Sequence, residues 1–140
     1  MSMPVTLESR TRVPWHHRAA ARFAVGAARL LVRLRPRRLR RVLESVRRGA
    51  RPADAATAGA ARAAVVAVSR RCAAQQCLQR SVATALLCRM WGVWPDWCTG
   101  VRTQPFRAHA WVEADGQAVG EREDVTLYRT MMEVRAHDRR

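Results

Sequence analysis

The first third of the chain repeats its apolar residues at the spacing of amphipathic helices. Residues 15–34 place an apolar stripe on one face and a row of arginines almost opposite it. The stripe consists of Phe23, Ala27, Leu30, Leu31 and Leu34, and the arginines are Arg18, Arg22, Arg29 and Arg33. Pro36 ends this helix and suits the start of a second, over residues 37–48, which ends at Gly49. Its inward positions are Leu39, Val42, Leu43 and Val46. The pattern predicts a helical hairpin with a basic back.

Two further helices follow with the same period. After the linker RPAD, an alanine-rich run to Arg71 predicts a helix whose core face carries apolar and small side chains. These are Ala61, Val65, Val68 and Cys72. The next helix extends from residue 77 to about Trp91, with Gly92 as its stop. Its buried stripe is Leu78, Val82, Ala85 and Leu86.

Beyond Gly92 the period changes from that of a helix to that of a strand. Residues 97–102 predict one strand, and residues 106–113 alternate between two faces. Phe106, Ala108, Ala110 and Val112 share one face, and Arg107, His109, Trp111 and Glu113 share the other. Asp115-Gly116 then marks a hairpin. We therefore expect an α+β fold, a three-stranded antiparallel meander with the helix of Cys77 on one face.

Charge is concentrated in the first third of the chain. The formal net charge is +15, and every basic residue is arginine. Residues 1–52 hold 14 arginines against Glu8 and Glu44, a net charge of +12, whereas residues 53–140 carry +3. We expect a basic helical extension over residues 1–52 and a core over residues 53–140, within one compact domain. The arginine face is either a solvated surface or a docking surface for an acidic partner. Nucleic acid is the less favoured partner, because neither a helix-turn-helix pattern nor an aromatic stacking platform is present.

The start of the sequence lacks the apolar core of a signal peptide, and no apolar run is long enough to cross a membrane. A cytoplasmic protein is expected. Disulfides are rare in that compartment, and the four cysteines form no CxxC pair. We predict neither a metal site nor a cofactor, and interpret Cys72, Cys88 and Cys98 as small buried hydrophobic residues.

Cys77 differs from the other cysteines because it lies in the first turn of its helix. There, unsatisfied backbone N–H groups and the positive end of the helix dipole favour a thiolate. His109 is the candidate base, and the hairpin register decides which acid orients it. A two-residue turn would turn Glu121 away from His109, whereas a three-residue loop with a bulge at Gly116 would put Glu121 directly opposite. We favour the second register, with Asp124 as the alternative orienter.

The motifs CLQR, at the start of a helix, and FRAHAWVE, followed by a hairpin to GE, resemble one family. This is the transglutaminase-like leader peptidase of lasso-peptide biosynthesis, a papain-type cysteine protease, and the resemblance covers residues 53–135. It implies that Cys77 is the nucleophile and His109 the general base and acid. Glu121 stands where the family often has aspartate. The implied substrate is a precursor peptide, the implied partners are a small leader-binding protein and a separate ATP-dependent cyclase, and no cofactor is needed.

Four more residues could assist such a site. Gln75 and Gln76 are candidates for the oxyanion hole, Arg80 lies one turn after Cys77, and Trp111 shares the strand face of His109. Each has an ordinary structural role as its alternative: helix start for the glutamines, a local ion pair for Arg80 and core packing for Trp111. Two other functions remain open, a transglutaminase-type acyl transferase and a non-catalytic basic adaptor that binds an acidic peptide or nucleic acid.

Overall fold

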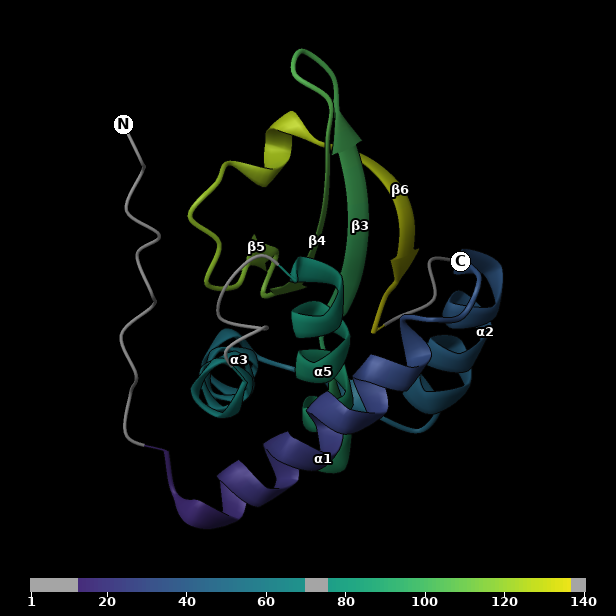
Figure 1. The fold of residues 1–140 in the computed structure, drawn as a ribbon. Helices are drawn as coiled ribbons and strands as arrows, with labels where there is room; N and C mark the ends of the chain where they lie inside the picture. The colour runs from purple at the N-terminus through teal and green to yellow at the C-terminus, as the bar shows by residue number, and fades with distance from the viewer. Residues whose placement is uncertain (1–12, 70–75, 137–140) are drawn as a thin grey trace.

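The computed structural model of the chain describes residues 13–69 and 76–136. Helices and a four-stranded sheet form an α+β fold (Figure 1). The helices are α1 (Trp15–Leu31), α2 (Pro36–Arg47), α3 (Ala55–Val68) and α5 (Cys77–Met90). The main strands are β3 (Asp96–Arg102), β4 (Arg107–Ala114), β5 (Gln117–Ala118) and β6 (Arg129–Val134). A short parallel pair, β1 (Arg51–Pro52) and β2 (Val93–Trp94), and the 3₁₀ helix η1 (Val125–Leu127) complete the described elements.

The sheet is antiparallel, in the order β5-β4-β3-β6, which is one strand more than the meander we expected. The extra strand is β6. Asp124 does cap the segment after the hairpin, because its carboxylate accepts a hydrogen bond from the backbone of Thr126. However, the helix it starts is only the three residues of η1, after which β6 pairs along β3. The sheet is therefore closed by the last strand of the chain.

Helix α5 lies at the centre of the molecule, between the sheet on one side and α1 and α3 on the other (Figure 1). Because α5 is surrounded in this way, more of its surface is buried than the predicted stripe covers. Val82 and Ala85 are fully buried as expected, but so are Ala83 and Leu87 on other sides of the helix. A helix covered on nearly all sides buries polar residues too, among them Gln79, Arg80 and Thr84. The first turn of α5 is thus held rigidly.

The predicted core face of α1 is wrong for Phe23 and Leu30, whereas Leu31 and Leu34 of the same stripe are partly buried against the core. Phe23 is 69% exposed and Leu30 is 66% exposed, while the face that packs on α5 and α3 is made of Ala21, Ala24 and Ala28. Small side chains let helix backbones approach closely, and a phenylalanine between these helices would hold them apart. Phe23 and Leu30 consequently lie at the surface.

Helices α1 and α2 do not form the expected hairpin, since they pack on different neighbours. Helix α1 packs on α5 and α3, and α2 lies beside β6 (Figure 1). Leu39 and Leu43 of α2 are buried in the same core as the alanines of α1 and the valines of α3. The Arg89 side chain ties α5 to α2 by donating a 2.8 Å hydrogen bond to the carbonyl oxygen of Val46. The described part of the basic region is therefore built into the core.

The described helices include none whose length and apolar character would let it cross a membrane.

Candidate active site

Cys77 is the first residue of α5, and its side chain is partly exposed. The N-cap residue Gln76 makes no side-chain hydrogen bond to the first turn, so no side chain of the cap competes for its N–H groups. Burial is the largest influence on the pKa of the Cys77 thiol, and it raises that pKa. Hydrogen bonds from His109 and the backbone of Ala110 outweigh it, aided by nearby positive charge. The net result is a pKa below the usual value, which favours the nucleophilic thiolate.

His109 lies on β4 with only 8% of its surface exposed. Its Nε2 atom is 2.6 Å from Oε2 of Glu121, and its ring also forms a hydrogen bond with the Cys77 side chain. Because Nε2 is engaged by Glu121, the nitrogen facing the sulfur is Nδ1. The hydrogen bonds to Cys77 and Glu121 raise the pKa of His109 to about 9. The arrangement therefore shifts the equilibrium toward a thiolate–imidazolium pair, because the pKa of Cys77 is lowered and that of His109 is raised.

The edge of β4 is open where Cys77 meets it. The partner strand β5 pairs only with Glu113 and Ala114, so the described sheet leaves the edge at His109 and Ala110 without a strand. His109 and Trp111 are on the face of β4 that points away from α5, as the alternation predicts. The sulfur reaches the imidazole at this edge.

Glu121 meets His109, but not by the register that we favoured. Ala114 pairs with Gln117 and Glu113 with Ala118, which is the two-residue turn over Asp115-Gly116. In a continued ladder this register would turn Glu121 away. Instead β5 ends at Ala118, and the chain bends at Gly120, whose φ is +66°. The bend brings the carboxylate back to Nε2, and both side chains are 7% exposed.

The bend itself rests on α3. A Cβ built on Gly120 would lie 2.8 Å from Cδ of Arg62, a residue that is 8% exposed. Real Cβ atoms do not approach neighbours so closely, and a positive φ is also costly for other residues. Glycine is therefore favoured at the position directly before Glu121, because any other residue would be strained at this φ and would displace the Arg62 side chain.

An aromatic group backs the imidazole. The Trp111 ring is stacked on His109, with centroids 5.8 Å apart and planes 16° apart. Tyr128 lies 5.6 Å from the His109 ring, and its hydroxyl donates a 2.6 Å hydrogen bond to Glu123. Gly100, opposite His109 on β3, leaves room for the indole, because a Cβ there would lie 3.0 Å from the Trp111 ring. Trp111 is thus both a buried residue and the wall behind the base.

A groove of about 650 Å³ opens on Cys77 and His109. Apart from these two, it is lined mostly by apolar side chains from the segment that joins α1 to α2, from β3 and from β6. They include Val32, Leu34, Pro36, Leu39, Val101, Met131 and Met132. The N-terminal region, which the sequence suggested as an extension, therefore contributes one wall of this groove.

The remaining residues that the sequence suggested for the site differ in their distance from Cys77 and His109. Gln75 lies outside the described residues, and Gln76 is exposed beside Cys77. Arg80 is buried one turn along α5, where its charge helps to lower the pKa of Cys77. Asp124 is engaged in capping η1 and does not contact His109, so the position of the alternative orienter is filled by Glu121 alone. Glu113 accepts a 2.9 Å hydrogen bond from the indole of Trp111.

The remaining described cysteines are chemically different. Cys88 and Cys98 are buried, and burial raises the pKa of each to about 12. Cys72 lies outside the described residues. Within residues 13–69 and 76–136, no group of three or more histidine, cysteine or acidic side chains is placed to hold a metal ion. Of the three cysteines that the structure describes, only Cys77 is partly exposed and has a lowered pKa.

The sequence profile of the Transglutaminase-like superfamily matches residues 21–133 of this chain. The chain belongs to that superfamily. The match begins within α1 and so includes the helices that build the groove wall. Transglutaminase-like enzymes generally depend on a cysteine, and their chemistry is that of a cysteine protease or an acyl transferase. No curated protein and no solved structure gives a significant match.

In this transglutaminase-like domain, sequence reasoning missed Tyr128, Glu123 and the wall that α1 and α2 supply. Tyr128 follows η1 and is brought to His109 only by the return of β6. The groove residues of the first third were assigned to helix faces without regard to the site. Neither set carries a local motif, so only their tertiary position identifies them.

Proposed function

We propose that this chain is a cysteine peptidase that removes the leader from a ribosomally made lasso-peptide precursor. One observation carries the proposal: hydrogen bonds connect Cys77, His109 and Glu121 in series, and Cys77 and His109 line a groove. A thiol, a base with a matched pKa and an acid behind it are the parts that nucleophilic acyl transfer needs.

In the first step the Cys77 thiolate attacks the carbonyl carbon of the scissile peptide bond. The oxyanion forms beside the first turn of α5, where backbone N–H groups can donate to it. The side chain of Gln75 or Gln76 is proposed as a second donor, because both precede the nucleophile in sequence. The imidazolium of His109 then gives its proton to the leaving amine, the C–N bond breaks, and a thioester remains on Cys77.

In the second step a water molecule attacks the thioester carbonyl. Neutral His109 takes a proton from that water, the C–S bond breaks, and the products are a free carboxyl group and the Cys77 thiolate. Glu121 accepts from Nε2–H throughout, which holds the ring orientation and stabilises the imidazolium. These steps use side chains of this chain alone.

The substrate assignment is supported by the motifs CLQR and FRAHAWVE together. The freed amine of the core peptide would be closed into a ring by a separate ATP-dependent cyclase. We propose in addition that a small leader-binding protein presents the precursor, and that both partners meet this chain in the cytoplasm. The exposed apolar side chains of α1, Phe23 and Leu30, offer surface for such a contact.

A transglutaminase-type acyl transferase is the second candidate, because superfamily membership fits it equally. It would form a thioester on Cys77 from the side-chain amide of a glutamine, with release of ammonia, and then transfer the acyl group to an amine instead of to water. The groove is compatible with both reactions, so the two functions are distinguished by identifying the reaction product.

The experiment is incubation of the chain with a candidate precursor peptide, with and without the leader-binding protein, followed by mass spectrometry. Two fragments whose masses sum to the precursor plus water support the peptidase. A product heavier than the precursor by an added amine, less ammonia, supports the transferase. A peptide left intact under both conditions, or processed equally by Cys77→Ala, would refute the assignment.

A further inference from the structure

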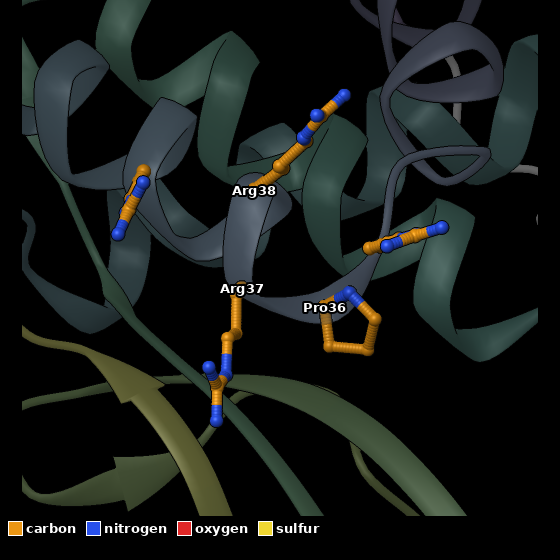
Figure 2. Close-up of a pocket in the computed structure, with 5 residues that line it drawn as sticks. Pro36, Arg37 and Arg38 are labelled. Carbon is orange, nitrogen blue, oxygen red and sulfur yellow. The ribbon is translucent and has the colours of Figure 1, made fainter.

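A second cavity lies at the start of α2. Its volume is about 510 Å³, and it is lined by Pro36 and four arginines: Arg35, Arg37, Arg38 and Arg41. Figure 2 shows the side chains of Arg37 and Arg38 extending in different directions from the beginning of the helix. We call these four side chains the α2 arginines.

The α2 arginines are exposed, and none of them has an ion pair or hydrogen bond with a side chain among the described residues. Arg40, which lies between Arg38 and Arg41 in the sequence, is instead paired with Glu44. The Nε atom of Arg40 is 3.1 Å from Oε1 of Glu44. An acidic partner is therefore present on this helix, but it lies outside the cavity.

The location of this charge is unfavourable for folding. The first turn of α2 contains no acidic residue, and the N-terminus of a helix already carries partial positive charge. Arg35, Arg37 and Arg38 lie at this end of the helix, where they repel one another and oppose the helix dipole. Charge that opposes the local structure is expected where it serves binding.

The arginine cavity adjoins the groove of Cys77. Pro36 lines both cavities, and Leu34 and Leu39, on either side of it in sequence, line the groove. A chain that occupies the groove can thus continue across Pro36 onto the α2 arginines without leaving the surface.

We propose that the α2 arginines bind the acidic part of the peptide substrate, whose apolar residues nearer the scissile bond fill the Cys77 groove. This inference rests on the peptide substrate proposed above and defines its chemical class: an acidic peptide with an apolar stretch. Arginine suits the task because its planar guanidinium pairs with a carboxylate through two hydrogen bonds.

A peptide fits this surface better than a nucleic acid does. Single-stranded nucleic acids require aromatic side chains on which bases stack, and the cavity is lined only by arginine and proline. The apolar groove with a thiol at its floor matches side chains and a peptide carbonyl, and it offers nothing to a phosphate backbone.

The test uses a fluorescent synthetic peptide with an apolar half and a half rich in glutamate, and a second peptide with glutamine in place of every glutamate. Binding to the full chain is followed by fluorescence anisotropy at low and high salt. We expect Arg37→Gln/Arg38→Gln to weaken binding of the acidic peptide about tenfold, since two partly exposed charge pairs are lost. The glutamine peptide should bind both proteins equally.

The matched control is Arg18→Gln/Arg29→Gln, which removes the same charge from exposed positions of α1. It should bind the acidic peptide as the unaltered protein does. The bound peptide should also protect Cys77 from iodoacetamide, and this protection should be lost in Arg37→Gln/Arg38→Gln. Equal loss of binding in both double variants, or binding without protection of Cys77, would overturn the inference.

Two outcomes separate this inference from the proposed function. If the acidic peptide binds, protects Cys77 and depends on the α2 arginines while no precursor is ever cleaved, the peptidase proposal fails and the binding site stands. If a precursor is cleaved equally fast by the unaltered protein and by Arg37→Gln/Arg38→Gln, the peptidase stands and the binding site fails. Tighter binding of a single-stranded oligonucleotide of equal charge at the same arginines would also overturn it.

Discussion

The two ends of α5 each carry a cysteine, and the two thiols differ in burial and in pKa. Cys77 opens the helix and Cys88 follows about three turns later on the same rigid element. Burial raises the pKa of both thiols. At Cys88 nothing opposes burial, and the pKa rises to about 12, whereas at Cys77 the imidazole and the backbone of Ala110 reverse the effect. Reactivity in this helix is thus set by the neighbours of the sulfur rather than by the helix or by the cysteine itself.

The comparison explains why the site lies where α5 meets the edge of β4. The first turn of a helix leaves N–H groups unpaired, and the short β5 leaves the adjacent strand edge open. Polar groups from both elements therefore converge on one sulfur. Three turns later the same helix is enclosed by apolar side chains, where a thiolate has no donor to stabilise it.

The largest expected effect is complete loss of cleavage when the Cys77 thiol is removed. Cys77→Ala should abolish cleavage, and His109→Ala should reduce it by about 10⁴-fold or more, because nucleophile and base act as one unit. Cys88→Ala should cleave normally, since that thiol only fills space in the core. Initial rates measured on one precursor peptide give the comparison. A Cys77→Ala protein that still cleaves would place the nucleophile elsewhere.

Selective alkylation sharpens the same contrast without any substrate. At mildly acidic pH iodoacetamide should label Cys77 and spare Cys88 and Cys98, because only the pKa of Cys77 is lowered while those of the other two are raised to about 12. His109→Ala should slow this labelling, since the hydrogen bond and charge that lower the Cys77 pKa are lost. Peptide mapping of the labelled protein identifies the site, and labelling after unfolding shows that all thiols can react. Equal labelling of Cys77 and Cys88 in the folded protein would contradict the pKa assignment.

A smaller effect concerns the acid behind the imidazole. The hydrogen bonds of His109 raise its pKa to about 9, so the imidazolium needed for the leaving amine is present below that pH and is lost above it. The cleavage rate should therefore fall as the pH rises through about 9. In Glu121→Gln one of the interactions that raises the pKa is removed, so the alkaline fall should move to lower pH, and the rate should drop by about 10- to 1000-fold. Asp124→Asn, at an exposed cap, should leave both the rate and the pH profile as they were.

The local periods of the sequence predicted much of the secondary structure. Helix α5 and strands β3 and β4 lie within a residue or two of their expected bounds, because each has a clear period and a glycine or proline at its end. The face of α1 was not predictable in the same way. Hydrophobicity favours burial of Phe23 over Ala24, but the space between α1, α3 and α5 admits only the smaller side chain.

The residues of the site were likewise predictable only where a local motif is present. Cys77 and His109 stand in short motifs with a chemical meaning, and the structure brings them together. The contact of Glu121 with His109 was expected from a register that the structure does not have, and it arises instead from a bend at Gly120. The groove wall from Leu34 to Leu39 depends on where α2 docks, which no local pattern encodes. The sequence therefore predicted the types of the site residues but not the tertiary positions of Glu121 and of the groove wall.

The smallest expected effect tests whether that bend holds the acid in place. Gly120→Ala adds a methyl group at a positive φ and 2.8 Å from Cδ of Arg62, so either the Arg62 side chain or the bend that carries Glu121 must shift, and we expect the bend to shift. The φ alone should lower the free energy of unfolding by about 1–2 kcal/mol. Gly116→Ala is the matched control, because its φ is +75° but nothing lies within 4 Å of the added methyl group. Denaturant unfolding should show a similar loss in both variants, whereas only Gly120→Ala should move the alkaline fall of cleavage toward that of Glu121→Gln. If the two alanine variants share one pH profile, the contact with Arg62 does not position Glu121, and the acid is held by His109 alone.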